Sequence, residues 1–298
     1  MAPRTSSLGS IFAQVTRTSF GSWAYRRWMS TKPLASYQLD ATSGIATISL
    51  GRGPLNTLTT SDLLSLSSMI DNASNDTNAR LLVIKSALPG VFSMGLDPVH
   101  AVSLDTTGRT ELFGALGRCY MSQMQCKIPT VALIDGGAFA GGAVLALACD
   151  LRYMSPAQGK VSFSESKVGL AIPPFIVSRL KSSILPGRAL FDMAVMAKTL
   201  SAEEAGAAGF TTVMEAANFE QEIQGLSGKI SRLSREVLST TLNVTRQEDA
   251  VACEKFIGSM AAGADSVDAD AFLKFMADHF IGEGLRAYME RREPVWKM

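Results

Sequence analysis

The sequence predicts an α/β protein with a helical C-terminal region, and three patterns support this fold class. Short apolar runs of strand length alternate with helical segments as far as residue 214, most clearly at Val131–Ile134. A glycine-rich turn, Asp135–Gly142, follows that run and leads into Ala143–Cys149, an apolar segment typical of a buried helix. From Phe219 onward the pattern is helical. The chain therefore combines a core of strands and helices with a helical tail.

The core strands are short, continuous apolar runs, which indicates that helices cover both faces of their sheet. We expect strands at residues 37–50, with a break at Thr42–Gly44, and at 81–84, 131–134 and 210–214. Core helices are expected at 59–70, 111–125, 143–149, 175–184, 188–198 and 202–208, and tail helices at 219–236, 246–262 and 268–290. Thr59–Asp62 offers an N-cap, and Ser201 begins another helix with an acid at its third position.

Residues 1–30 differ from the rest of the chain. They are rich in Ser, Thr and Arg, and no acidic residue precedes Asp40. This composition is typical of a mitochondrial transit peptide, with a disordered basic N-terminus as the alternative. We therefore expect a transit peptide at 1–30, a core at 31–215, a helical region at 216–298, and a location in the mitochondrial matrix.

Composition excludes several classes of protein. The net charge of +1 gives no general attraction to nucleic acid. No apolar run reaches the roughly 18 residues of a membrane span. The four cysteines form no CxxC pair, so we expect reduced, packed thiols. With two histidines and no GxSxG motif, the sequence argues against a histidine metal site or a Ser-His-Asp triad. No metal and no cofactor are expected.

Two features carry the functional prediction. A glycine turn before a helix leaves backbone N–H groups unpaired, where an oxyanion can bind. It lacks the GxGxxG and P-loop patterns, so a nucleotide site is a weak interpretation. The second feature is Glu165, which lies between Phe163 and the apolar run Val168–Ile172. Burial there would raise its pKa toward that of a general base, whereas an exposed or Lys167-paired glutamate is the alternative.

Three motifs together resemble the enoyl-CoA hydratase/isomerase (crotonase) superfamily. Phe92–Asp97 resembles its F-S-A-G-x-D loop, with Met94 where Ala is usual. Ile134–Gly142 resembles its (I/V)-x-G-x-x-x-G-G loop, and Phe163–Pro173 resembles its acidic loop ending in G-x-x-P. The similarity extends from about residue 37 to 214 and continues more weakly through the tail. Within the superfamily the chain looks most like the mitochondrial enoyl-CoA delta isomerases.

The resemblance implies a spiral of repeated strand–strand–helix turns, with C-terminal helices that build a homotrimer or hexamer. It implies an acyl-CoA substrate, of which coenzyme A is a part. The backbone amides of Met94 and Gly141 would bind the thioester oxygen, and Glu165 would be the catalytic acid and base. Substrate contacts are implied for a further set of residues: Gly95, Leu96, Asp97, Pro98 and Ser164.

Val144 occupies the position at which hydratases of the superfamily carry a second glutamate. One base suffices to move a proton between two carbons, whereas water addition uses two carboxylates. We therefore expect isomerisation of a 3-enoyl-CoA to the 2-trans-enoyl-CoA in fatty-acid β-oxidation. The alternatives are hydration or another acyl-CoA reaction, and a catalytically silent trimeric binding protein. His100 is expected to be a surface or lid residue, and Asp97 to cap or hydrogen-bond its own loop.

Overall fold

The computed structural model describes residues 32–185, 187–262, 283–290 and 292–296. The described residues from Leu34 onward belong to one compact unit, which the description below concerns. The transit peptide predicted for residues 1–30 and most of the helix predicted for residues 268–290 lie outside the described residues.

The larger sheet has six strands in the order β1-β2-β4-β7-β9-β12. Their bounds are β1 (Ala35–Asp40), β2 (Ile45–Leu50), β4 (Leu81–Ser86), β7 (Thr130–Ile134), β9 (Leu151–Met154) and β12 (Thr212–Val213). β1 and β2 form an antiparallel hairpin, and the predicted break at Thr42–Gly44 is its turn. The remaining neighbours in this sheet pair in parallel.

A smaller sheet has the order β11-β10-β8-β5, and β3 pairs with β6 separately. The bounds are β3 (Thr57–Leu58), β5 (Gly90–Ser93), β6 (Gly95–Leu96), β8 (Gly136–Phe139), β10 (Lys160–Ser162) and β11 (Leu200–Ser201). The central turns of the chain place one strand in the larger sheet, the next in the smaller sheet, and then form a helix, as in β7–β8–α6 and β9–β10–α7. The predicted spiral of strand–strand–helix turns is confirmed.

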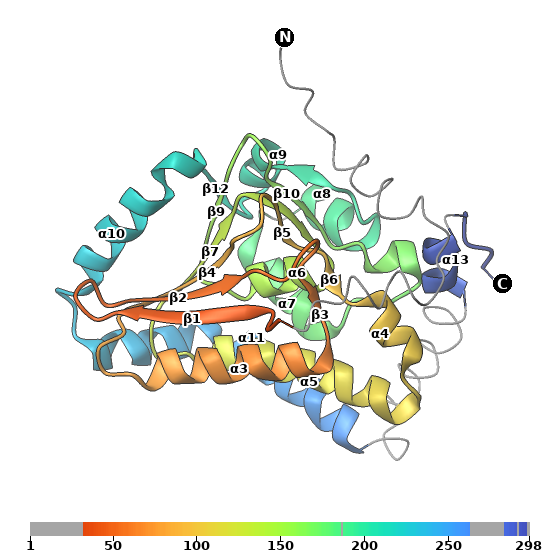
Figure 1. The fold of residues 1–298 in the computed structure, drawn as a ribbon, viewed down its shortest axis with the longest axis horizontal. Coiled ribbons are helices and arrows are strands. Elements are labelled where there is room, and N and C mark those ends of the chain that lie inside the picture. Colours follow the sequence, from red (N-terminus) through yellow and green to blue (C-terminus); the bar gives the residue numbers. More distant parts are fainter. Residues whose placement is uncertain (1–31, 186, 263–282, 291, 297–298) are drawn as a thin grey trace, which may run out of the picture. The chain divides into compact units, whose positions relative to one another are not determined.

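Helices pack on both sides of the larger sheet (Figure 1). The helices are α3 (Thr60–Asn75), α4 (Pro98–Ser103), α5 (Thr106–Met124), α6 (Gly141–Leu147), α7 (Pro174–Ser183), α8 (Arg188–Leu190), α9 (Ala202–Ala207), α10 (Phe219–Ile230), α11 (Arg235–Ala262) and α13 (Leu285–Glu290). α3, α5 and α11 pack together on one side, and α10 lies on the other. Thr59 and Ser201 each close a capping box, as their sequence predicted.

The first tail helix begins at Phe219 and the second ends at Ala262, as predicted, but the prediction was wrong about where the first ends and the second begins. α10 ends at Ile230, and α11 runs without a break from Arg235 to Ala262, across the interval predicted to separate two helices. Residues 240–245 are mostly weak helix formers, but the buried side chains of Arg246, Cys253 and Phe256 hold α11 against the core. The helix predicted for residues 188–198 is also shorter, because α8 passes into a π-helical turn at Phe191–Val195.

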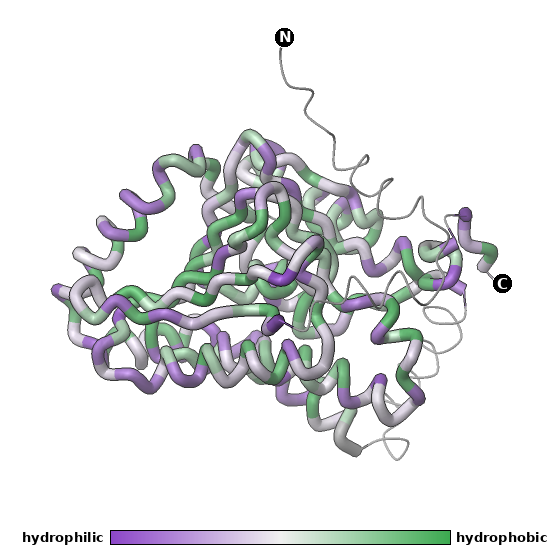
Figure 2. Tube along the Cα trace, in the orientation of Figure 1, coloured by the Kyte–Doolittle hydropathy of each residue, from purple (hydrophilic) through white to green (hydrophobic). Residues whose placement is uncertain are grey.

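Alternate residues of the central strands enter two different apolar clusters. Ala46, Ile48 and Ile84 face the helices α3 and α5, while Ile45 and Val83 face α10. Figure 2 shows the hydrophobic residues concentrated along these strands, with hydrophilic residues recurring along the outer helices. The continuous apolar strands are thus covered on both faces, as predicted.

The buried guanidinium of Arg246 ties α11 both to Asp150, just before β9, and to the end of α5. Arg246 is 1% exposed and makes two hydrogen bonds to the Asp150 carboxylate, at 2.8 and 2.6 Å. Its guanidinium also donates to the carbonyl oxygen of Cys126, just beyond α5. Burial acts to raise the pKa of Asp150, but the hydrogen bonds and charge of Arg246, together with two hydrogen bonds from Thr130, outweigh it, so the pKa lies below its ordinary value.

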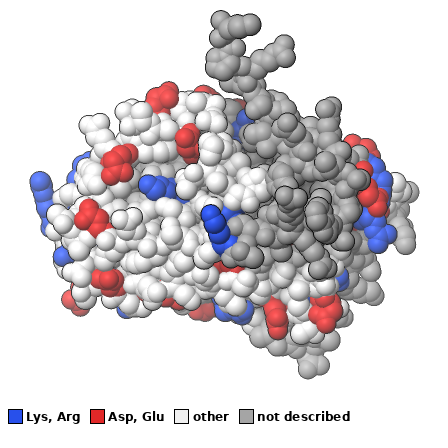
Figure 3. All heavy atoms as spheres, in the orientation of Figure 1, with Lys and Arg blue, Asp and Glu red and all other residues white. Residues whose placement is uncertain are grey.

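In the part of the chain that the structure describes, the cysteines, the possible metal ligands and the helices can be compared with the classes that composition argues against. All four cysteines are buried and free. Within the described ranges, no group of three or more His, Cys, Asp or Glu residues could hold a metal ion. Among the described helices, none is both long and apolar enough to cross a membrane. On the face shown in Figure 3, acidic and basic side chains of described residues are interspersed, without a stripe of one sign.

Candidate active site

Three neighbouring parallel strands of the smaller sheet end at one edge, and each leads into one of the predicted site segments. β5 precedes Met94, β8 precedes Gly141, and β10 precedes Glu165. The register pairs Ser93 with Ala138, and Ser162 with Phe139, so the three strand ends are level. The carboxyl edge of parallel strands is where ligands bind in open α/β sheets. The topology therefore brings the three predicted segments to one edge.

The turn between β8 and α6 presents the amide of Gly141. Ala140 precedes the helix with φ 46° and ψ −124°, a conformation that is strained for a residue with a side chain. Its N–H donates to the Ser162 carbonyl oxygen at 2.9 Å, which ties the turn to β10. The Gly141 N–H donates to none of the described residues. It is the first amide of a buried helix, so it is oriented to bind an acceptor from outside the chain.

The Met94 amide is already engaged. Its N–H donates to the carbonyl oxygen of Leu55 at 3.1 Å. The neighbouring Asn56 is fully buried and donates to the Phe92 carbonyl oxygen at 3.0 Å, while Ser93 donates back to the Asn56 carbonyl oxygen at 2.7 Å. A substrate oxygen that takes up the Met94 N–H must therefore share it with Leu55 or displace that carbonyl.

Glu165 begins a short 3-10 helix, η1 (Glu165–Val168), and points into the protein. It is 4% exposed, and its Oε2 atom has no hydrogen-bond partner among the described residues. Desolvation by burial raises the pKa of Glu165 to about 7. The burial of Glu165 excludes a solvated glutamate, and the exposed Lys167 forms no ion pair with it among the described residues.

The other buried acids in the described part of the chain have partners. Asp62 pairs with Arg52, Asp249 pairs with Arg179, and Asp97 accepts a hydrogen bond from the His100 amide at 2.8 Å. These three carboxylates are fixed by structural contacts. Glu165 differs from them because it retains an unpartnered oxygen in a buried setting, which is typical of a general base.

The remaining predicted residues surround the first loop. Gly95 and Leu96 form β6, and Asp97 caps α4, where Pro98 is the first residue. The predicted capping role of Asp97 is confirmed, and its second oxygen accepts from Thr57 Oγ1 at 2.8 Å. His100 is partly exposed, with Nε2 lying 3.0 Å from Thr60 Oγ1.

Ser164 directly precedes the predicted acid, and Val144 follows the predicted Gly141 amide by three residues. Ser164 is partly exposed and precedes η1, without a side-chain hydrogen bond that caps this turn. Val144 is 2% exposed and lies in the first turn of α6. The residue one helical turn after the Gly141 amide is therefore apolar and buried.

Two buried arginines that the sequence interpretation did not single out hold the other end of α6. Arg152 donates to the carbonyl oxygens of Leu147 and Cys149 at 3.2 and 2.5 Å. Arg179 donates to the same two oxygens at 3.3 and 3.2 Å. Burial, followed by the charge of Arg179, lowers the pKa of Arg152 to about 10. Arg152 lies between two of the functional motifs and Arg179 follows the last of them, but a single arginine in a strand or helix carries no spacing signal.

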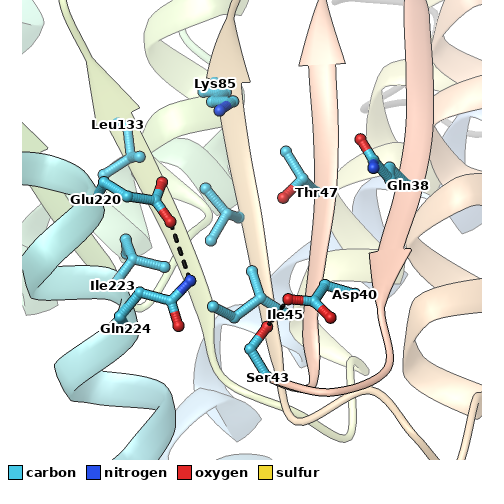
Figure 4. A pocket seen from close by; sticks show the side chains of 11 residues that line it. Gln38, Asp40, Ser43, Ile45, Thr47, Lys85, Leu133, Glu220, Ile223 and Gln224 are labelled. Atoms are coloured by element: carbon cyan, nitrogen blue, oxygen red, sulfur yellow. Dashed lines mark hydrogen bonds between the residues drawn. The ribbon is translucent and has the colours of Figure 1, made fainter.

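A groove elsewhere on the protein is separate from these segments. It lies between α10 and the outer face of β1, β2 and β4 (Figure 4). Its apolar floor includes Ile45 and Ile223, and Glu220 is hydrogen-bonded to Gln224 at its rim. None of its lining residues comes from β5, β8 or β10, so it is not part of the candidate site.

Replacement of Gly95 by alanine tests the close approach of the two backbone loops. Gly95 has φ +84°, and a Cβ there would lie 2.6 Å from the Gly141 nitrogen. We expect Gly95→Ala to displace that amide and reduce kcat/KM by roughly 100-fold, the scale expected for a 1 Å misplacement. Steady-state kinetics and a melting temperature check this.

Gly225→Ala is the matched control, because Gly225 lies in α10 with open space around it. This variant should keep full activity and gain stability by roughly 0.5–1 kcal/mol, as alanine favours a helix interior. Full activity in folded Gly95→Ala would exclude this contact from the site.

Comparison with known proteins relates the whole core and tail to one family. The sequence model of the family described as "Enoyl-CoA hydratase/isomerase" matches residues 40–298. "Probable enoyl-CoA hydratase 2, mitochondrial" of Arabidopsis thaliana is 26% identical over 256 residues, 85% of this chain and 82% of the relative. "Enoyl-CoA delta isomerase 1, mitochondrial" of Homo sapiens is 26% identical over 177 residues, 59% of this chain and 58% of the relative.

Solved structures agree on the fold. The crystal structure of human mitochondrial delta3-delta2-enoyl-CoA isomerase has a TM-score of 0.71 over 87% of this chain and 97% of that chain. At 20% sequence identity, this similarity concerns the fold. The relatives include proteins named for hydration and proteins named for isomerisation, so similarity leaves the choice of reaction to the residues of the site.

Proposed function

Because the chain belongs to the enoyl-CoA hydratase/isomerase family, and is thus an acyl-CoA enzyme of the crotonase superfamily, we propose that it isomerises 3-enoyl-CoA to 2-trans-enoyl-CoA. The observation that supports this choice is the buried carboxylate of Glu165 with its unpartnered oxygen. In this proposal Glu165 is the catalytic base and acid, and the amides of Gly141 and Met94 bind the thioester oxygen. Coenzyme A enters as part of the substrate, and no separate cofactor is used.

The proposed reaction moves one proton within the substrate. Glu165 removes a proton from C2, and the electron pair of the broken C–H bond shifts toward the thioester oxygen to give a dienolate. The protonated Glu165 then returns the proton to C4, so the double bond moves from C3–C4 to C2–C3. Preorganised N–H donors stabilise the developing oxyanion, and one such donor is worth about 3–4 kcal/mol. Loop residues Gly95–Pro98 and Ser164 would border the substrate.

Val144 supports isomerisation over hydration in this proposal. Water addition needs a group that activates and orients water, and two carboxylates can share that task. The valine side chain has no acceptor for a water hydrogen, and its 2% exposure leaves it packed in the core. Proton transfer between C2 and C4 needs one base alone, which Glu165 supplies.

An assay of both reactions on the purified protein tests the proposal. A panel of 3-enoyl-CoA thioesters of several chain lengths should give the conjugated product, followed by its absorbance. The same protein should add water to 2-enoyl-CoA far more slowly. Faster hydration than isomerisation would favour the hydratase alternative, and binding of acyl-CoA without turnover of any 3-enoyl-CoA would favour a silent binding protein.

The pH dependence follows from burial of the base. Glu165 must be ionised to accept the C2 proton, and burial raises its pKa to about 7. We expect kcat/KM to fall tenfold for each pH unit below that value and to level off above it. A profile that stays flat down to the ordinary pKa of a glutamate would show that a desolvated Glu165 is not the base.

The cellular location and assembly extend the proposal. We place the protein in the mitochondrial matrix and assign residues 1–30 to a transit peptide, which the basic, acid-free composition of this segment supports. Two relatives carry "mitochondrial" in their names. We also assign the C-terminal helices to a homotrimer or hexamer. Imaging of a fusion to residues 1–30 and light scattering of the purified protein would check these two assignments.

A further inference from the structure

We propose that Arg179 is a positioning residue that holds the Glu165 loop and the Gly141 amide in a fixed relation. The inference rests on the proposed function, because it assigns a structural cause to the alignment of the same base and donor. It arises from a buried guanidinium that joins three helices, two of which lead directly to the site.

The first link runs from Arg179 back to Glu165. Arg179 lies in the middle of α7, which begins at Pro174. The segment between η1 and α7 is short. Within it, the Leu170 N–H donates to the Glu165 carbonyl oxygen at 3.0 Å, which ties this segment to the residue that carries the base. A shift of α7 therefore passes directly into the turn that carries the base.

The second link runs from Arg179 to the oxyanion helix. Its guanidinium donates to the carbonyl oxygens of Leu147 and Cys149, which end α6 and the turn after it. The last carbonyls of a helix lack partners within the helix, and a cation there is favourable toward the helix dipole. α6 has seven residues, with Gly141 as the first, so fixing its end fixes the amide that starts it.

The third link anchors Arg179 to the tail. Arg179 Nη1 lies 3.2 Å from Asp249 Oδ2 on α11, and Ser178 donates to Asp249 Oδ1 at 2.8 Å. Asp249 is 3% exposed and Arg179 is 9% exposed, so neither charge is solvated freely. Separating such a buried pair would leave an uncompensated charge, which is unfavourable. The ion pair therefore helps to keep the three helices together.

Arg152 shares the carbonyls of α6 but makes a different connection. It lies on β9 and donates also to the Phe210 carbonyl oxygen, so it joins α6 to the sheet. No hydrogen bond of its guanidinium among the described residues reaches α7 or α11. Arg179 is therefore the guanidinium that connects the base loop with the oxyanion helix. A lysine cannot reproduce its planar fork of donors in three directions.

Kinetics of Arg179→Lys, with Arg246→Lys as the matched control, test this role. Each variant loses a buried arginine that forms an ion pair with an aspartate, and in each pair one partner lies on α11. Among the described residues, however, the Arg246 guanidinium bonds to no α6 carbonyl. We expect Arg179→Lys to lower kcat by about 10- to 100-fold with KM changed less than twofold, since misalignment acts on the chemical step. Arg246→Lys should keep kcat within twofold at a temperature where circular dichroism shows both variants folded.

A second readout does not require turnover. The infrared band of a ¹³C-labelled thioester carbonyl in bound octanoyl-CoA, a saturated and unreactive acyl-CoA, reports how strongly the amide donors polarise it. The band should lie below its solution frequency in the wild type and in Arg246→Lys, and return toward it in Arg179→Lys. Asp249→Asn should produce the same change in weaker form, and it decides the question if Arg179→Lys does not fold.

The outcomes separate this inference from the proposed function. Unchanged kcat and carbonyl frequency in folded Arg179→Lys would overturn the inference, as would an equal loss in Arg246→Lys. A wild type that binds octanoyl-CoA but turns over no 3-enoyl-CoA would overturn the proposed reaction alone. The carbonyl frequency would then still decide whether Arg179 positions the donors.

Discussion

Glu165→Gln should reduce isomerase activity by about 10²- to 10⁴-fold while acyl-CoA binding is retained. General acid–base catalysis by a positioned side chain is worth a factor of this size, and glutamine has nearly the same shape but cannot accept the C2 proton. The measurements are kcat for a 3-enoyl-CoA and the dissociation constant of octanoyl-CoA. Near-wild-type turnover in the glutamine variant would remove Glu165 from the mechanism.

The same substitution should stabilise the protein at high pH. The folded-state pKa of Glu165 is raised to about 7, so the folded protein holds a proton that the unfolded chain releases at lower pH. Stability of the wild type therefore falls as pH rises from the ordinary glutamate pKa to about 7, and this loss is fully present above that range. Glu165→Gln should melt above the wild type at pH 8 and close to it at pH 4. A melting temperature below the wild type at pH 8 would contradict the desolvation of this carboxylate.

Arg246→Met should cost about 3–5 kcal/mol of the free energy of unfolding, the largest stability effect that we expect. It leaves the Asp150 carboxylate without its countercharge and with the Thr130 donors alone, and the carbonyl oxygen of Cys126 without its guanidinium partner. Breaking a buried ion pair by removing one partner has a cost of this size. Urea unfolding followed by circular dichroism measures it.

Two comparisons give this prediction its control. Arg188→Met removes an exposed ion pair with Asp192, and it should leave the melting temperature nearly unchanged. The double variant Arg246→Met with Asp150→Asn should cost less than the sum of the two single changes, because the residues share one network. Additive costs would show that the two side chains act independently.

The sequence predicted the elements whose signal is local. Thr59 and Ser201 were assigned as caps because a capping box needs a few adjacent residues, and α7 was predicted within one residue at each end. Strand β8 was hidden within the predicted glycine turn, since four residues rich in glycine carry no alternating pattern. Its strand character comes from pairing with β5 and β10, which are distant in sequence.

The site was predictable in its parts but not in its internal contacts. The apolar run after Glu165 indicated burial, and the structure agrees. The bond from Met94 to the Leu55 carbonyl oxygen joins segments that carry no shared pattern. The same is true of Arg179, whose partners Leu147 and Asp249 lie 32 and 70 residues away. Long-range hydrogen bonds to backbone oxygens leave no compositional trace.

The level ends of β5, β8 and β10 have a consequence for how such enzymes diversify. Each strand belongs to a different winding of the chain, so the Met94 loop, the α6 helix with Gly141 and Val144, and the Glu165 loop are carried on scaffolding that can vary separately. Under the proposed reaction, exchange of one side chain on one winding can redirect the fate of the dienolate without disturbing the parts that create it. A single architecture can in this way acquire new chemistry in small, individually tolerated steps.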